Sequence, residues 1–233
     1  DGGAIVIQGE NLSNTGSILA DASGNGSNGG AIEYSAGGNA IHEGVMSASS
    51  AQGKGGAISV TGENVGVAGT VAADGLADPQ GGNNGGYIEF ASTNNAVFAP
   101  TARVSAKGNG EIRINQPGSD VAAFEKTATI LYDGASLDAG TDGFLEVSGG
   151  GLSIGQVSLT AGHILFDPTN ITFSDLGGAI GDTNNGVPGG NAFSGPDFIE
   201  AFNEDVGDDV VFNINPAGSG VLSAGTIVSG ATI

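Results

Sequence analysis

Short runs of alternating apolar and polar residues recur along the chain, and the clearest of them follow a pair of glycines. The run at residues 4–7 returns about every 27 residues, a period typical of repeat architectures. Alternation with a period of two sends one set of side chains inward and the other outward from a strand. The expected inward anchors are Ile5, Ile32, Ile58, Ile88 and Ile112. The positions expected to point outward are Glu33, Ser59, Glu89, Arg113 and Glu146.

A second run follows each first one and ends in an alanine, whose small volume suits a tight turn. These alanines are Ala20, Ala48, Ala73, Ala106 and Ala139. A third apolar site lies between the two runs, at Leu12, Ile41, Val65 and Val97. Three short strands per repeat, separated by Gly, Asn and Asp turns, predict an all-β fold, a single-stranded parallel β-helix with three strands per rung. A β-sandwich is the less favoured alternative, because its strands are usually longer and share no single anchor pattern.

The repeats divide the chain into three parts. Residues 1–173 are expected to form the repetitive rungs, of which 116–133 are the least regular, with Ile130 either in an extra rung or in an insertion. Residues 174–196, rich in Gly, Asn and Pro, predict a loop. In the last part, 197–233, the apolar spacing predicts a short amphipathic helix near residues 197–203, followed by a strand at 210–214 and further β-helix strands.

Composition and charge narrow the range of partners. The 233 residues include 45 glycines and no cysteine, and the formal net charge is −20. Without cysteine there is no disulfide or thiolate chemistry. The negative charge argues against nucleic acid and anionic membrane surfaces, and no apolar run reaches the about 20 residues of a membrane span. A polar surface poor in Lys and Arg indicates a secreted protein, and the strand-like last residues indicate a fragment of a longer chain.

Basic and histidine side chains are the first candidates for chemistry. Four of the five basic residues, Arg103, Lys107, Arg113 and Lys126, fall within 24 positions of one another, and β-helix polysaccharide lyases use such side chains. However, Arg113 stands between Glu89 and Glu146 in the ladder, so an ion pair across strands explains it without catalysis. Both histidines, His42 and His163, are expected at solvated or turn positions. Two tyrosines, Tyr34 and Tyr87, are expected on the surface, where they would matter for a ligand.

Acidic turns are the candidates for a metal. Asp182, Asn184, Asp205 and Asp208 supply oxygen ligands of the kind that Ca²⁺ prefers. The spacing lacks the bidentate Glu of a calcium loop, so solubilising turns are the favoured interpretation. We therefore expect no cofactor, with Ca²⁺ as the single candidate ion.

One stretch resembles a known family. Gly-Phe-Leu-Glu-Val-Ser-Gly-Gly at 143–150, followed by Gly-His-Ile-Leu-Phe-Asp-Pro-Thr-Asn-Ile at 162–171, resembles a segment of filamentous-haemagglutinin-like exoproteins, the large adhesins secreted by the two-partner route. Residues 197–203 are similar to a short helix of the same family. The resemblance implies a right-handed parallel β-helix, export across the bacterial outer membrane and a role as an adhesin or a surface fibre.

Together these observations predict a shaft segment of a secreted, non-enzymatic bacterial surface adhesin that binds a glycan or protein of cells or matrix. The first alternative is a structural fibre or coat subunit whose contacts, including end-to-end association, are with copies of itself. The second is a β-helix polysaccharide lyase or hydrolase. We expect no nucleic acid partner and no membrane insertion.

Overall fold

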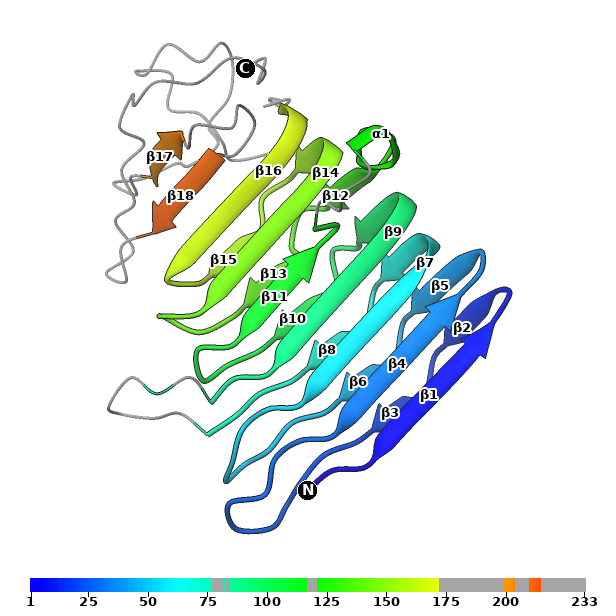
Figure 1. Ribbon diagram of the computed structural model, residues 1–233, viewed down its shortest axis with the longest axis vertical. Coiled ribbons are helices and arrows are strands. Elements are labelled where there is room, and N and C mark those ends of the chain that lie inside the picture. The colour runs from blue at the N-terminus through cyan, green and yellow to red at the C-terminus, as the bar shows by residue number, and fades with distance from the viewer. Residues whose placement is uncertain (77–81, 83, 117–120, 172–198, 204–209, 215–233) are drawn as a thin grey trace.

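The computed structural model in Figure 1 describes residues 1–76, 82, 84–116, 121–171, 199–203 and 210–214. Within these ranges the chain is mostly β, and long parallel strands build a 12-stranded and a 6-stranded sheet. As far as the strand at residues 163–171, the strand order of both sheets follows the chain, so that each sequence repeat stacks on the preceding one (Figure 1). The expected mostly β architecture with parallel strands is thus confirmed for the described residues up to β16, whereas the two described strands after it pair antiparallel.

The first arm of the large sheet carries the predicted ladder. Its strands are β1 (Ala4–Gly9), β4 (Ala31–Ala36), β7 (Ala57–Val67), β9 (Tyr87–Phe98), β11 (Glu111–Ile114), β14 (Phe144–Ile154) and β16 (His163–Ile171). Ile5 pairs with Ile32, and the register continues through Ile58, Ile88 and Ile112. The last four are buried, whereas Ile5, on the first strand, is partly exposed. The glycine-flanked alternation therefore predicted this register correctly.

A second arm of the same sheet has a different register from the one expected. Its separate strands are β2 (Leu12–Asn14), β5 (Asn39–His42) and β12 (Ala128–Leu131). Strand β2 pairs with β5, β5 pairs with the second half of β7, and β12 pairs with the second halves of β9 and β14. Ala40, Val65 and Ala96 point inward in one column. The sequence pattern aligned Ile41 and Val97 with Val65, but each of the two lies one residue away from that column. A shift of one residue moves a whole strand to its other face.

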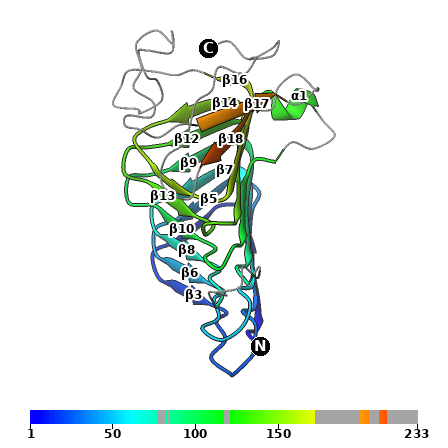
Figure 2. The ribbon, with the colours of Figure 1, turned by 90° about the vertical axis from the view of Figure 1, so that its left-hand side faces the viewer.

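The 6-stranded sheet closes the other side of each repeat. Its strands are β3 (Ser17–Leu19), β6 (Val45–Ser47), β8 (Thr70–Ala72), β10 (Arg103–Ser105), β13 (Ser136–Asp138) and β15 (Ser158–Thr160). Figure 2 shows β3, β6, β8, β10 and β13 stacked in chain order. The five alanines that follow β3, β6, β8, β10 and β13 are all buried, as the repeat predicted.

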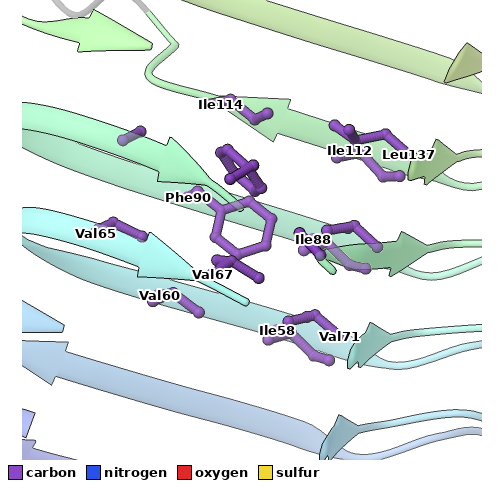
Figure 3. Close-up of a cluster of buried hydrophobic side chains, with 14 of the residues drawn as sticks. Ile58, Val60, Val65, Val67, Val71, Ile88, Phe90, Ile112, Ile114 and Leu137 are labelled. Atoms are coloured by element: carbon purple, nitrogen blue, oxygen red, sulfur yellow. The ribbon is translucent and has the colours of Figure 1, made fainter. Parts of the chain in front are cut away.

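Aliphatic side chains from both sheets meet in a narrow core. In Figure 3, Ile58 of β7 lies beside Val71 of β8, and Val60 lies further along β7; these side chains are one repeat below Ile88 and Phe90. Phe90 also packs edge to face on Phe98, with ring centroids 5.0 Å apart. Burial of such apolar side chains supplies the main driving force for stacking the repeats.

Asparagines line one edge of the stack, where the first arm bends into the second. The Asn39 side-chain amide donates to Asn11 Oδ1 at 3.0 Å, and Asn64 donates to Asn39 Oδ1 at the same distance. Asn94 and Asn95 in turn donate to Asn64 Oδ1. Side-chain amides thus tie successive repeats together at this bend.

The least regular segment contains a short helix that the sequence pattern did not predict. After β11 the chain forms helix α1 (Val121–Phe124) and then enters β12, which pairs with β9 and β14. Ile130 therefore belongs to a second-arm strand of the stack, and the insertion is the part between β11 and β12.

The prediction of a helix near residues 197–203 was wrong. Ile199–Asn203 is strand β17, antiparallel to β18 (Val210–Ile214), and β18 is antiparallel to β16. A helix of so few residues is only marginally stable, whereas a strand gains a full set of backbone hydrogen bonds from its partner. The strand at 210–214 was predicted correctly. The expected loop at 174–196 lies outside the described residues.

Candidate functional site

A groove of about 760 Å³ runs along the stack beside the starts of the first-arm strands. Its floor is formed by the glycine pairs that precede those strands and by Ala4, Ala31 and Ala57. The glycines are required by packing: a Cβ on Gly29 or Gly55 would collide with the carbonyl oxygen of the alanine that ends the second run of the same repeat, Ala48 or Ala73. The repeat thus creates a smooth surface of main chain and small side chains, with its length along the stacking direction.

The groove floor changes character toward its C-terminal end. The position that is alanine in β1, β4 and β7 becomes Tyr87, then Glu111, then Phe144, which are neighbours in register and all line the groove. All three side chains are half-buried. The sequence pattern carried a signal for this column, because the residue after the glycine pair departs from alanine at Tyr87. The expectation of an exposed Tyr87 holds in part, whereas Tyr34 is buried in the core column and was predicted wrongly.

A charged cluster adjoins this column. Arg113 ion-pairs with Glu111 and, through Nη1, with Glu146 Oε2 at 2.9 Å. Its guanidinium also lies 5.2 Å from the centroid of the Phe144 ring, a cation–π contact. The predicted ion pair across strands is therefore present.

Glu146 points outward from its strand, as expected, but it is buried. Only 2% of the residue is exposed, and Ser148 Oγ donates to its Oε1 at 3.1 Å. It points to the outer side of the strand, but Arg113 and Leu165 flank it in the neighbouring strands and Ser148 lies beside it. Burial of the carboxylate makes the pair with Arg113 a structural requirement.

The pKa values of Arg113 and Tyr87 are both raised by their surroundings. Burial opposes the charge of Arg113, but the hydrogen bond and charge of Glu111 outweigh it and raise the arginine pKa above its ordinary value. Burial, and then the charge of Glu89, raise the pKa of Tyr87. Tyr87 therefore keeps its phenolic proton and offers a neutral hydroxyl at the groove.

The four clustered basic residues do not form one site. Arg103, in β10 of the 6-stranded sheet, donates to the carbonyl oxygens of Pro100, Ala102 and Gly134. Lys107 Nζ is 3.8 Å from an Asp138 carboxylate oxygen, and Lys126 is exposed after α1. Only Arg113 of the four belongs to the groove end, which leaves the arrangement without the convergent cations expected of a lyase.

His42 is wholly buried, which corrects the expected solvated position. It shares an inward column with Val67 and Phe98, a consequence of the one-residue register shift in β5. His42 Nε2 lies 3.0 Å from the Thr70 carbonyl oxygen, which can only accept, so Nε2 carries the proton. His42 Nδ1 then accepts from Asn14 Nδ2 at 3.1 Å. Burial lowers the pKa of His42, and hydrogen bonds to backbone atoms of Thr70 and Gly44 oppose this to a smaller extent.

The stability of the stack should therefore depend on pH through His42. At pH above about 6.5 the ring is neutral in both folded and unfolded chains, and its stabilising contribution is complete. As the pH falls below that value the unfolded chain binds a proton that the folded chain does not, so the free energy of unfolding decreases. Urea unfolding between pH 8 and 5.5 should show wild type losing stability relative to His42→Gln. Parallel pH profiles for the two proteins would contradict this assignment.

The remaining candidates add no site within the described residues. His163 is exposed at the start of β16, as expected. The proposed Ca²⁺ ligands Asp182, Asn184, Asp205 and Asp208 all lie outside the described residues. Across the part of the chain that is described, no three His, Asp or Glu side chains gather in a way that could hold a metal ion.

Within the same ranges, no helix is long and apolar enough to cross a membrane. Comparison with protein-family models, with curated protein sequences and with solved structures found no match to this chain.

Proposed function

We propose that this chain is a segment of a secreted bacterial surface adhesin of the filamentous-haemagglutinin type, which binds a glycan of cells or matrix without chemical turnover. The observation that carries the proposal is the groove along the stack, which ends in the column Tyr87, Glu111 and Phe144. Aromatic rings beside hydrogen-bonding groups suit ligands that have both apolar and polar faces. Sugars have this character.

A right-handed, single-stranded parallel β-helix is the proposed fold of the shaft. Up to β16, the strand order follows the chain in both sheets and the strands of successive repeats pair in parallel, which supports this fold. Further support comes from the two arms of the large sheet and the third strand that each repeat adds to the 6-stranded sheet. Crossovers between parallel strands of one sheet are right-handed in nearly all proteins. Such a shaft would present the groove at the cell surface along its length.

A non-enzymatic role is favoured by the way the groove-end carboxylates are held. Glu111 and Glu146 both ion-pair with Arg113. Glycoside hydrolysis uses two carboxyl groups that flank the scissile bond, and Glu146 is too deeply buried to reach a ligand in the groove. The cluster is therefore better suited to orienting hydroxyl groups than to transferring protons.

The test is retention of the purified chain on immobilised polysaccharides and on intact bacterial and host cells, with Ca²⁺ and with a chelator. The proposal predicts selective retention and no release of soluble sugar. Retention that needs Ca²⁺ would assign a role to the acidic turns. Release of reducing or unsaturated sugars would replace the adhesin by an enzyme, and absence of retention on every surface would overturn glycan binding.

Contacts between copies of the chain are a second candidate function. The outer edge of β1 has no partner strand among the described residues, and its Val6 is 60% exposed. Open strand edges pair readily with other chains. Solution scattering at high protein concentration and high salt would show elongated assemblies if this function applies, and a monomer if it does not.

A further inference from the structure

The groove end supports a more specific inference, which rests on the proposed glycan-binding function. We propose that the groove binds an uncharged, extended β-linked glycan lying lengthwise along the stack, with sugar rings against Tyr87 and Phe144 and hydroxyl groups donating to Glu111. The glycines alone would carry no such proposal, because packing at the turns explains them. The aromatic, carboxylate, aromatic column at one end of the groove points to a ligand.

The spacing between the residues of this column favours a glycan chain that extends along the stacking direction of the repeats. Tyr87, Glu111 and Phe144 stand on three successive strands, β9, β11 and β14. Neighbouring strands lie about 4.8 Å apart, and one ring of an extended β-1,4-linked glycan advances along its chain by a comparable distance. Two rings in alternate positions would therefore meet Tyr87 and Phe144, and the ring between them would meet Glu111.

The groove walls favour a ligand without charge. Apart from Glu111 and Asp142, every residue that lines the groove is uncharged, and the chain as a whole carries −20. An anionic polysaccharide would be repelled by this field, and the floor offers it no free cation because Arg113 is engaged by two carboxylates. The carboxylate of Glu111 accepts hydrogen bonds, so hydroxyl-rich neutral sugars match it.

The groove floor next to Tyr87 favours a flat ligand. Ala57 pairs with Tyr87 in register, is exposed, and continues the surface toward Ala31 and Ala4. Small side chains there let a ribbon-like glycan approach the backbone along several repeats. A larger residue at position 57 would stand in the path of the glycan without disturbing the core.

The experiment is calorimetric titration of the full chain with cellohexaose and chitohexaose, and with a polygalacturonate oligomer as the charged comparison. Ala57→Ile fills the floor at an exposed strand position where a β-branched residue is well tolerated. Tyr87→Leu and Phe144→Leu remove the aromatic faces but keep apolar bulk. Each variant should weaken binding of the neutral oligomer at least tenfold, with thermal stability measured alongside.

Tyr132→Leu is the matched control, because Tyr132 is 51% exposed and lies outside the groove. Its affinity should equal that of wild type. If the wild-type protein binds a glycan and all three groove variants bind it with the same affinity, the glycan binds elsewhere on the protein. That result would overturn the groove assignment but not the proposed function. Preference for polygalacturonate would overturn the uncharged ligand. Wild-type protein that neither titrates with these oligomers nor is retained on any glycan would overturn both.

Discussion

Arg113→Met should lower the free energy of unfolding by about 3 kcal/mol, because it removes the cation paired with a buried carboxylate. Glu146 has a side chain that is 3% exposed, and Arg113 Nη1 contacts it at 2.9 Å. Methionine keeps much of the apolar stem against Phe144 but supplies no charge. Urea unfolding followed by far-ultraviolet circular dichroism would measure the loss.

Two controls separate this pair from ordinary surface charge. Lys107→Met removes a cation that is 61% exposed and 3.8 Å from Asp138, and it should cost no more than about 0.5 kcal/mol. Adding Glu146→Gln to Arg113→Met removes the buried charge as well, so the double variant should be more stable than Arg113→Met alone. Equal losses for Arg113→Met and Lys107→Met would show that burial of Glu146 is irrelevant to the pair.

The contrast between Ile32 and Ile41 shows how far the repeat pattern could predict the fold. Ile32 follows a glycine pair that fixes where its strand starts, so its inward direction could be deduced from alternation alone. Ile41 has no such marker, and Ala40 and His42 point inward in its place. Gly66 beside it has no side chain, and a Cβ there would lie 2.8 Å from Ile41 Cδ1, so Ile41 finds room on the outer face. That compensation between neighbouring strands is invisible within either strand alone.

The candidate site could be predicted only in part for a similar reason. The repeat placed Arg113 between Glu89 and Glu146, and the register confirms both neighbours. Alternation assigns a side chain to a face of the sheet, but it does not say what covers that face, and the burial of Glu146 was therefore missed. The groove follows from the stacking of many glycine pairs, a property of the assembled repeats that no single repeat contains.

Asn115→Ala should also lower the free energy of unfolding by about 3 kcal/mol, since it combines an unfavourable backbone conformation for alanine with the loss of a buried hydrogen-bond network. Asn115 directly follows β11 and has φ of 51°, in the left-handed region that asparagine tolerates better than alanine. Its Oδ1 accepts from the backbone N–H of Ser92 at 2.7 Å and from Ser92 Oγ at 3.0 Å. Its Nδ2 donates to Thr129 Oγ1 at 2.9 Å, and Thr129 Oγ1 donates to the Ser148 carbonyl oxygen at 2.6 Å.

This network replaces apolar packing where the chain leaves the stack toward α1. Thr129 occupies the inward column between Ala96 and Leu152, and Asn115 is its partner from the first arm. Truncation of Asn115 would leave a buried Ser92 N–H without its acceptor, which is costlier than losing an exposed hydrogen bond. The three strands β9, β11 and β12 would then be less firmly joined at this bend.

Asn109→Ala is the matched control for the backbone penalty. Asn109 has φ of 65°, also left-handed, but its side chain accepts only an exposed hydrogen bond from Asp142 N–H at 3.2 Å. Asn109→Ala should therefore lower the free energy of unfolding by about 1 kcal/mol, the cost of placing alanine in this conformation. Asn115→Gly relieves that same strain and should still lose most of the stability that Asn115→Ala loses. If Asn115→Gly were as stable as wild type, the backbone conformation alone would account for Asn115, and the network to Ser92 and Thr129 would contribute nothing measurable.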